Sequence, residues 1–300
     1  MLNTTISVII PYYNHIRYIE ECLLSIVSQK QGRFEIIVVN DSSTDNSHEF
    51  LLSLQKKYDF ELIQNSFNIG CSASIKVGLS HSTGDYVCVL ASDDTFVKDR
   101  FPAQLDCLIE SGFDVLYGNC SIISDRKDQP SVPKLREFVK AYSISNDEVL
   151  KLIYTQDFSL PLLQSALFKR SVFCEIQDLK KDVKSDDWVT LICSFRYYRA
   201  GFSNKATFVY RIHDNNSHSS YWKLLSNRFE VISDFVPEGY RDKAFSSVIW
   251  SIYDHKRLNG HSIESIQYAL ASFLLDFRSF RFKIILFNLL KTIFKRNNKL

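Results

Sequence analysis

Two adjacent carboxylates, Asp93 and Asp94, follow an apolar run that predicts a buried strand over residues 86–90. Acidic side chains at the carboxyl end of such a strand lie where open α/β sheets place their ligands. Carboxylate oxygens and phosphate oxygens together can complete the coordination of Mg²⁺ or Mn²⁺. The pair therefore predicts a divalent metal held against a diphosphate, and the alternative is a solvated turn of the kind that Asp favours.

The composition fits a folded globular enzyme rather than a polyanion-binding protein. Hydrophobic residues make up 45% of the 300 residues, and 36 basic against 34 acidic residues leave a net charge of +2. The seven cysteines contain no C-x-x-C spacing. This argues for reduced thiols in a cytoplasmic setting and against a zinc site or a disulfide framework. Because the chain enters a strand-like run almost at once, we expect no signal peptide.

Short apolar runs alternate with helix-like segments up to about residue 118. Strands are predicted at residues 6–10, 35–39, 60–64, 86–90 and 113–117. Apolar residues recur at helical spacing over 16–27, and a second helix is predicted to begin near Asp45, with Asp45 as its N-cap. Repeated β-α-β units of this kind imply a mostly parallel sheet covered by helices on both faces. We therefore predict an α/β fold of the nucleotide-binding type.

The ends of the first two strands carry groups that could recognise a nucleobase. The chain has no G-x-G-x-x-G after the first strand and no P-loop, which argues against a dinucleotide site and a P-loop NTPase. Tyr13, just beyond the first strand, could stack on a base. Asp41, just beyond the second, could accept the imide N–H of uracil, although a simple turn and helix cap is the alternative.

Five short motifs, in this order, resemble those of family 2 glycosyltransferases with the GT-A fold. They are SVIIPYYN (7–14), VVNDSSTD (38–45), NIG (68–70), GDY (84–86) and LASDD (90–94). The resemblance spans about residues 5–220, and the motifs are specific as a set. It implies an inverting enzyme that takes a sugar from a nucleoside diphosphate, usually UDP.

The resemblance also implies roles for individual residues. Nucleobase contacts would come from Pro11, Tyr13 and Asp41. The acidic motif would bind ribose and metal through Asp93 and Asp94. The family commonly has an aspartate two places before the first of this pair, where this chain has Ala91. Metal binding must then rest on Asp93 and Asp94, and which of them touches the ion is left open.

A second acidic pair, Asp186 and Asp187, begins a helix-like run. Acids at a helix start are common as caps, because they are favoured by the free N–H groups and the dipole. In the family, however, the matching Glu-Asp-Trp has the general base at its second acid, which implies Asp187. Asp186 stands where the family has Glu.

Downstream, Arg211 and His213 follow a strand-like stretch at 206–209. Alternation along the strand places both on one face, where they could reach a diphosphate. The segment resembles the family's Arg-x-His segment, which closes over the donor. Together with the metal, these two side chains would hold the leaving diphosphate. A histidine on a strand face is otherwise more often structural.

The sequence beyond residue 220 departs from the family pattern. Residues 262–277 predict an amphipathic helix, and 280–296 predict another with apolar side chains on one side and basic ones on the other. Seven basic residues lie within 278–299, and no acid follows Asp276. The stretch is too interrupted to span a bilayer and favours a helix lying on an anionic membrane surface; the alternative is a helix packed on the catalytic domain.

We therefore predict a GT-A glycosyltransferase domain at 1–220 and a helical C-terminal extension at 221–300. The expected activity is transfer of a sugar from a UDP-sugar to a hydroxyl of a glycan acceptor, lipid-linked, in bacterial surface polysaccharide synthesis such as O-antigen or capsule. Mn²⁺ or Mg²⁺ is the expected cofactor, the inner face of the cell membrane the expected location, and nucleic acid is not an expected partner. A nucleotidyltransferase is one alternative, although it would usually show a Gly-rich basic loop after strand one. A non-catalytic sugar-nucleotide binder is the other.

Overall fold

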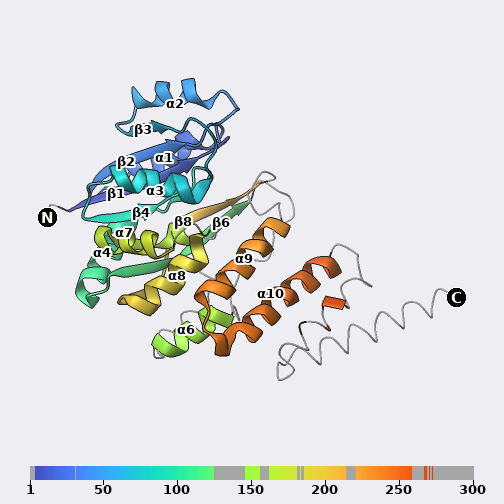
Figure 1. Ribbon diagram of the computed structural model, residues 1–300. Coiled ribbons are helices and arrows are strands. Elements are labelled where there is room, and N and C mark those ends of the chain that lie inside the picture. The colour runs from blue at the N-terminus through green and yellow to red at the C-terminus, as the bar shows by residue number, and fades with distance from the viewer. Residues whose placement is uncertain are drawn as a thin grey trace. The chain divides into compact units, whose positions relative to one another are not determined.

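The computed structural model describes residues 4–30, 32–124, 146–155, 162–180, 183, 186–213, 221–258, 267, 268, 270 and 272. The chain divides into two compact units (Figure 1). The first unit comprises residues 1–149 and 159–219, and the second comprises residues 150–158 and 220–300.

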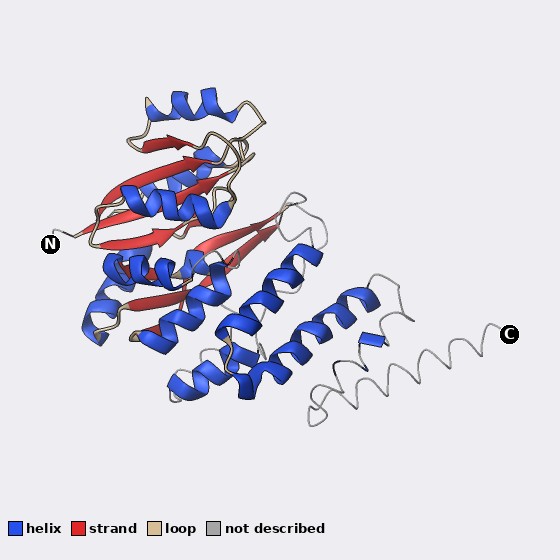
Figure 2. Ribbon diagram, in the orientation of Figure 1, coloured by secondary structure: helices blue, strands red, loops and turns tan. Residues whose placement is uncertain are grey.

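An eight-stranded sheet forms the centre of the first unit (Figure 2). Its order is β3 (Glu61–Gln64), β2 (Arg33–Asn40), β1 (Thr5–Tyr12), β4 (Tyr86–Val89), β7 (Leu167–Lys169), β6 (Val115–Ser124), β8 (Ala200–Ile212) and β5 (Thr95–Phe96). Strands β1 to β4 run parallel, as do β6 and β8, whereas β7 is antiparallel to both of its neighbours. The predicted α/β fold with a mostly parallel sheet is confirmed, and the short strands β5 and β7 are additions to it.

Helices cover both faces of the sheet, as predicted (Figure 2). On one face, Ile6, Val8 and Ile10 of β1 belong to the same buried cluster as the apolar side of α1 (Ile19–Val27). Helices α2 (Ser47–Gln55) and α4 (Arg100–Ser111) add to that cluster. On the other face, α3 (Cys71–His81) packs so closely that Gly78 meets Ile9. The alternation of side chains along β1 thus supplies apolar groups to both helical layers.

The remaining helices come after β6 in the chain, and β7 and β8 lie among them. They are α6 (Asn146–Thr155), the 3₁₀ turn η1 (Leu163–Ser165), α7 (Arg170–Leu179), α8 (Asp186–Tyr197), α9 (Tyr221–Phe235) and α10 (Glu238–Leu258). In the second unit, α9 and α10 pack through the rings of Phe229 and Phe245, whose centroids are 5.4 Å apart. The amphipathic helices predicted at 262–277 and 280–296 fall almost wholly outside the described residues. Within the part of the chain that is described, no helix has the length and apolar character needed to cross a membrane.

The start of α2 differs from the prediction. Asn46, in the left-handed region with φ 60°, occupies the cap position, and Asp45 lies one residue earlier. The Asp45 carboxylate accepts a hydrogen bond from the backbone N–H of Ser47 at 3.3 Å and another from Ile16 at 3.2 Å. The prediction that Asp45 is the N-cap was therefore wrong by one residue. Its carboxylate ties the loop after β1 to the start of α2 instead, and Asn tolerates the left-handed backbone that this requires.

The close approach of α3 to the sheet generates a test of the packing. A Cβ at Gly78 would lie 2.5 Å from Cγ2 of Ile9 and 3.2 Å from Cγ2 of Val39. We expect Gly78→Ala to lower the free energy of unfolding by about 1–3 kcal/mol, the usual cost of overpacking a core. The matched control is Ser80→Ala, at an exposed position of the same helix, which should change stability little. Equal urea midpoints for the two variants would show that the helix moves away from the sheet at no cost.

Candidate functional site

The carboxyl ends of β1, β2 and β4 lie at one edge of the sheet, because the three strands run parallel. The segments that follow them start side by side: Asp41 N–H donates to the carbonyl of Tyr12 at 2.8 Å, and Leu90 N–H to that of Ile9 at 3.0 Å. The predicted residues after β1, β2 and β4 therefore share this edge. The end of β8 reaches the same place through Arg211, which bonds to both Asp93 and Asp94.

Asp41 is buried and holds the loop between β3 and α3. Its carboxylate accepts hydrogen bonds from the backbone N–H groups of Ile69 and Gly70, both at 2.8 Å, and from the Asn65 side chain at 2.9 Å. Gly70 has φ 88°, a conformation that L residues rarely adopt. A carboxylate has about four acceptor positions, so one remains beyond these three bonds. The predicted contact of Asp41 with a nucleobase stays a prediction, and its anchoring of the 65–70 loop is an additional role.

Tyr13 is 43% exposed. Hydrogen bonds of the next residue restrain the backbone at this point. The next residue, Asn14, has φ 56°, and its N–H donates to Oγ of Ser43 at 3.1 Å. Its side-chain oxygen accepts the N–H of Thr44 at 2.8 Å. The loops after β1 and β2 are thereby joined, and the ring of Tyr13 is presented to solvent. Pro11 is half-buried within β1, opposite Val39.

Asp94 is 1% exposed, and both of its carboxylate oxygens have partners. One accepts the backbone N–H of Arg211 at 2.8 Å, and the other accepts the Gln164 side chain at 3.3 Å. Burial raises the pKa of Asp94, and the charge of Asp93 adds to the rise, whereas these two hydrogen bonds and the charge of Arg211 oppose it. The prediction that Asp94 binds the metal stays a prediction. Its observed contacts hold the end of β8 and η1 against the edge of the sheet.

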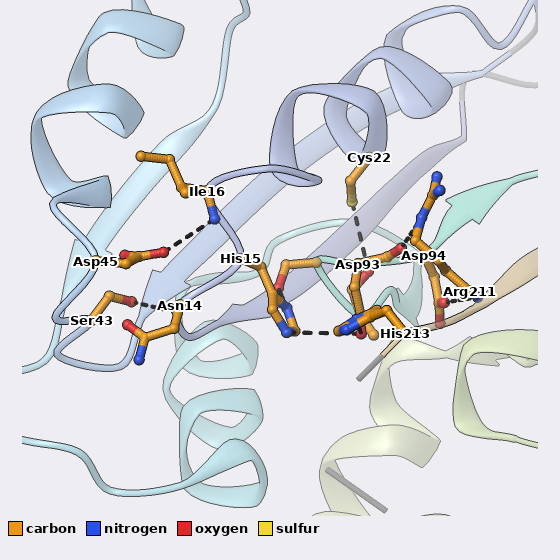
Figure 3. Close-up of polar contacts among 12 residues, drawn as sticks. Asn14, His15, Ile16, Cys22, Ser43, Asp45, Asp93, Asp94, Arg211 and His213 are labelled. Atoms are coloured by element: carbon orange, nitrogen blue, oxygen red, sulfur yellow. Dashed lines mark hydrogen bonds and ion pairs between the residues drawn. The ribbon is translucent and has the colours of Figure 1, made fainter. Parts of the chain in front are cut away.

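Asp93 forms the centre of a cluster with two histidines. Its Oδ2 lies 3.0 Å from Nε2 of His213 and 3.8 Å from Nε2 of His15. The three ligand atoms lie within 4.8 Å of one another, and Figure 3 shows the side chains converging. Ligands around a small divalent cation lie within about 4.2 Å of one another, because each bond is about 2.1 Å long. A small movement of side chains therefore lets this set hold such a cation.

His15 has the environment of a neutral ligand. Its Nδ1 shares a hydrogen bond of 2.8 Å with Oγ of Ser92, so a proton on Nδ1 leaves the lone pair of Nε2 directed toward Asp93. Burial lowers the pKa of His15, and the charge of Asp93 only partly opposes this. The neutral imidazole is the form that binds metals.

Arg211 is buried and bonded within the protein. Its Nε donates to the carbonyl of Asp93 at 3.1 Å, and its Nη2 pairs with Glu21 of α1 at 2.6 Å. The guanidinium also lies over the ring of Tyr18, 5.3 Å from its centroid. The predicted contact of Arg211 with a diphosphate stays a prediction. Its observed contacts place a positive charge beside the acidic pair.

Asp187 lies at the start of α8 and is half-buried. Its Oδ1 accepts the backbone N–H of Leu163 in η1 at 2.6 Å, which orients the carboxylate. Burial raises the pKa of Tyr210, and the charges of Asp94, Asp93 and Asp187 add to the rise in that order. Asp187 is thus within electrostatic reach of the same tyrosine as the acidic pair. The side chain of Asp186 is outside the described residues.

Four residues of the site were missed by the sequence reasoning. They are His15, Tyr18, Glu21 and Gln164, which contact Asp93, His213, Arg211 and Asp94 respectively. A histidine directly after the Pro-Tyr-Tyr-Asn strand end was the available signal for His15. The other three lie in stretches where the pattern indicates only a helix start or a loop.

The comparison with protein families matches residues 7–176, more than half of the chain, to the model "Glycosyl transferase family 2". Among curated proteins, glycosyltransferase GlyA of Streptococcus pneumoniae is 28% identical over 71% of this chain and 31% of its own length. WfgD of Escherichia coli, named a UDP-Glc:alpha-D-GlcNAc-diphosphoundecaprenol beta-1,3-glucosyltransferase, is 23% identical over 77% of this chain and 86% of its own length. The chain spans about a third of the length of GlyA and of the Rickettsia relatives that it matches.

Two solved structures share the fold. TarS 1–349 of S. aureus, in complex with UDP-GlcNAc, has a TM-score of 0.60 at 20% identity and covers 89% of this chain and 79% of its own. The mannosyltransferase PcManGT of Pyrobaculum calidifontis, in complex with GDP-Man and Mn²⁺, has a TM-score of 0.57 at 19% identity and covers 97% and 87%. These likenesses confirm the predicted GT-A fold. The family match over more than half of its length shows that this chain belongs to glycosyl transferase family 2.

Proposed function

We propose that the protein is an inverting, metal-dependent glycosyltransferase that transfers a sugar from a UDP-sugar to a hydroxyl of a lipid-linked glycan in bacterial surface polysaccharide synthesis. The observation that supports this most is the meeting of His15, Asp93 and His213 at the edge of the sheet where Asp41 and Tyr13 also lie. A cation-binding cluster beside groups that can contact a nucleobase is what a nucleoside diphosphate donor requires.

The donor site extends from the exposed ring of Tyr13 to the histidine cluster. Tyr13 stacks on the base, with Pro11 and Asp41 as its neighbours at the ends of β1 and β2. We propose a uridine nucleotide as the donor because the name of WfgD contains UDP-Glc and the TarS structure contains UDP-GlcNAc. GDP is the alternative that PcManGT suggests.

Asp93, His213 and His15 would hold the cation, and Asp94, which the sequence predicts as a metal ligand, would be the second carboxylate. Two imidazoles and a carboxylate favour a first-row transition ion such as Mn²⁺ over Mg²⁺, which prefers an all-oxygen shell. When bound, the cation neutralises charge on the departing diphosphate. The guanidinium of Arg211 adds positive charge at the same place. Its contacts with Glu21 and Asp93 hold it there, so in this proposal it does not move to close over the donor.

Asp187 is the general base in this proposal. Displacement with inversion needs a group that takes the proton of the acceptor hydroxyl on the side of the sugar opposite the diphosphate. The hydrogen bond from Leu163 N–H fixes the direction of the Asp187 carboxylate. Because a carboxylate is a weak base at neutral pH, positioning contributes more than proton affinity.

The acceptor is proposed from the name of a relative, and the membrane contact is proposed from the amino-acid sequence of residues 278–299. The acceptor in the name of WfgD is a diphosphoundecaprenol-linked sugar. The basic, apolar segment at 278–299 has the composition of a helix that lies on anionic lipid. A lipid-linked acceptor would place the enzyme on the inner face of the cell membrane.

The first test of the proposal measures donor binding. We expect UDP to bind more tightly with Mn²⁺ than without it in isothermal titration calorimetry. Asp93→Asn should remove this difference, because it takes away the charge at the centre of the cluster. Asp106→Asn, an exposed aspartate on α4, is the matched control and should keep the full effect. If Asp93→Asn also keeps it, the cation lies elsewhere, and if the parent protein binds GDP but not UDP, the donor assignment is wrong.

The second test concerns the base. Asp187→Asn keeps the size of the side chain and can still accept the Leu163 N–H, but it cannot take a proton. We expect sugar transfer to fall by at least about 10²-fold with UDP affinity unchanged. Asp178→Asn on the exposed side of α7 serves as the control. Near-normal turnover of Asp187→Asn would move the base to another residue.

The third test concerns the membrane. Each basic residue near an anionic leaflet contributes about 1 kcal/mol, so removal of residues 278–300 should release the protein from vesicles that contain anionic lipid. Flotation assays at low and high salt measure this, and salt should weaken binding of the full chain. UDP binding should be unchanged by the deletion. A full-length protein that does not float with anionic vesicles at low salt contradicts the membrane proposal and leaves the donor site unaffected.

A further inference from the structure

The ring of Tyr18 contacts three of the side chains that surround Asp93. It stacks on the imidazole of His213, with centroids 4.7 Å apart and planes 26° from parallel. The ring of His15 packs against it in a T-shaped arrangement, with centroids 6.0 Å apart and planes at 78°. Arg211 lies over the same ring, 5.3 Å from its centroid. Nothing in the proposed chemistry uses Tyr18, yet it is the common neighbour of both histidines of the cluster.

Tyr18 itself is held by the backbone at the start of α1. Its N–H donates to the carbonyl of His15 at 3.0 Å, and its carbonyl accepts the N–H of Cys22 at 3.0 Å. One turn further along the helix, Glu21 pairs with Arg211 at 2.6 Å. The first turn of α1 therefore contacts the end of β8 at two points, one aromatic and one ionic.

His213 needs such support because of its place in the chain. Strand β8 ends at Ile212, so the backbone of His213 lies outside the sheet. A cation can contact both Asp93 and His213 only while Nε2 of the ring faces Oδ2 of Asp93, as it does here at 3.0 Å. Rotation of the His213 ring about its side-chain bonds would turn Nε2 away from Oδ2 of Asp93. The flat face of Tyr18 opposes that rotation, because the two rings would lose their stacking.

We infer that Tyr18 is a positioning residue that sets the ring orientation of His213 for cation binding. The inference rests on the proposed cation site at His15, Asp93 and His213. Loss of a group that orients a metal-binding histidine typically lowers metal affinity by about 10- to 100-fold, and we expect loss of a stacked ring to have an effect at the lower end of that range. The hydroxyl of Tyr18 is not required for this role, so phenylalanine should serve as well.

The experiment measures Mn²⁺ affinity of the full chain without nucleotide, from the electron paramagnetic resonance signal of free Mn²⁺. Tyr18→Leu should weaken binding by about tenfold. Tyr18→Phe should stay within about twofold of the parent, because it keeps the ring. Tyr197→Leu removes a 55% exposed ring from the end of α8 and should have no effect. Tyr18→Met is the substitute if Tyr18→Leu does not fold, as judged by thermal unfolding of the metal-free protein.

A double-mutant cycle with His213→Ala distinguishes positioning from general packing. If Tyr18 acts through His213, Tyr18→Leu has no further effect on Mn²⁺ affinity once His213 is removed. Additive losses would overturn the inference, and so would equal weakening by Tyr18→Phe and Tyr18→Leu. Unchanged affinity in Tyr18→Leu would overturn it while leaving the cation site intact. If the parent protein does not bind Mn²⁺, or if His213→Ala binds it normally, the proposed cation site itself is wrong.

Discussion

The hydrogen bond from the backbone N–H of Arg211 to the carboxylate of Asp94 joins two segments 117 residues apart, and the site depends on it. A buried carboxylate is costly unless hydrogen bonds satisfy it, and here Arg211 and Gln164 supply them. The same contact fixes the end of β8 beside the loop after β4. With this contact in place, Nε2 of His213 lies 3.0 Å from Oδ2 of Asp93. The buried acid thus has a structural role, because it fixes the end of β8 from which His213 reaches Asp93.

The loops around Asp41 and Tyr13, where we propose that the donor binds, are organised by hydrogen bonds from side chains to backbone groups. Asp41 holds the loop from Asn65 to Gly70, and Asn14 joins the loops that follow β1 and β2. Loops held in this way can present an exposed ring such as Tyr13 without losing their conformation. Preorganisation of this kind reduces the ordering cost of binding a ligand, and it would favour the nucleobase contact that we propose for these loops.

Local sequence patterns predicted the central architecture well. The apolar runs at 6–10, 35–39 and 86–90 correspond to β1, β2 and β4, because buried parallel strands need apolar side chains on both faces. Strands β5 and β7 escaped prediction, since two or three residues contain no readable period. The predicted N-cap of α2 was one residue too early. The Asp45 carboxylate also accepts the backbone N–H of Ile16 in the loop after β1, and a contact with another loop cannot be predicted from the local pattern.

For the site, the sequence by itself determined which residue types stand at the strand ends: Tyr13, Asp41, the Asp93–Asp94 pair and the Arg211-x-His213 segment. Motif order identified the family from these. Tertiary structure alone decided that His15 and His213 meet at Asp93, and that Glu21 and Tyr18 contact the end of β8. It also decided that both oxygens of Asp94 are used inside the protein. The physical reason is that periodicity reports only which face of an element is buried, whereas contacts between residues 70 to 200 positions apart depend on how the sheet and α1 pack together.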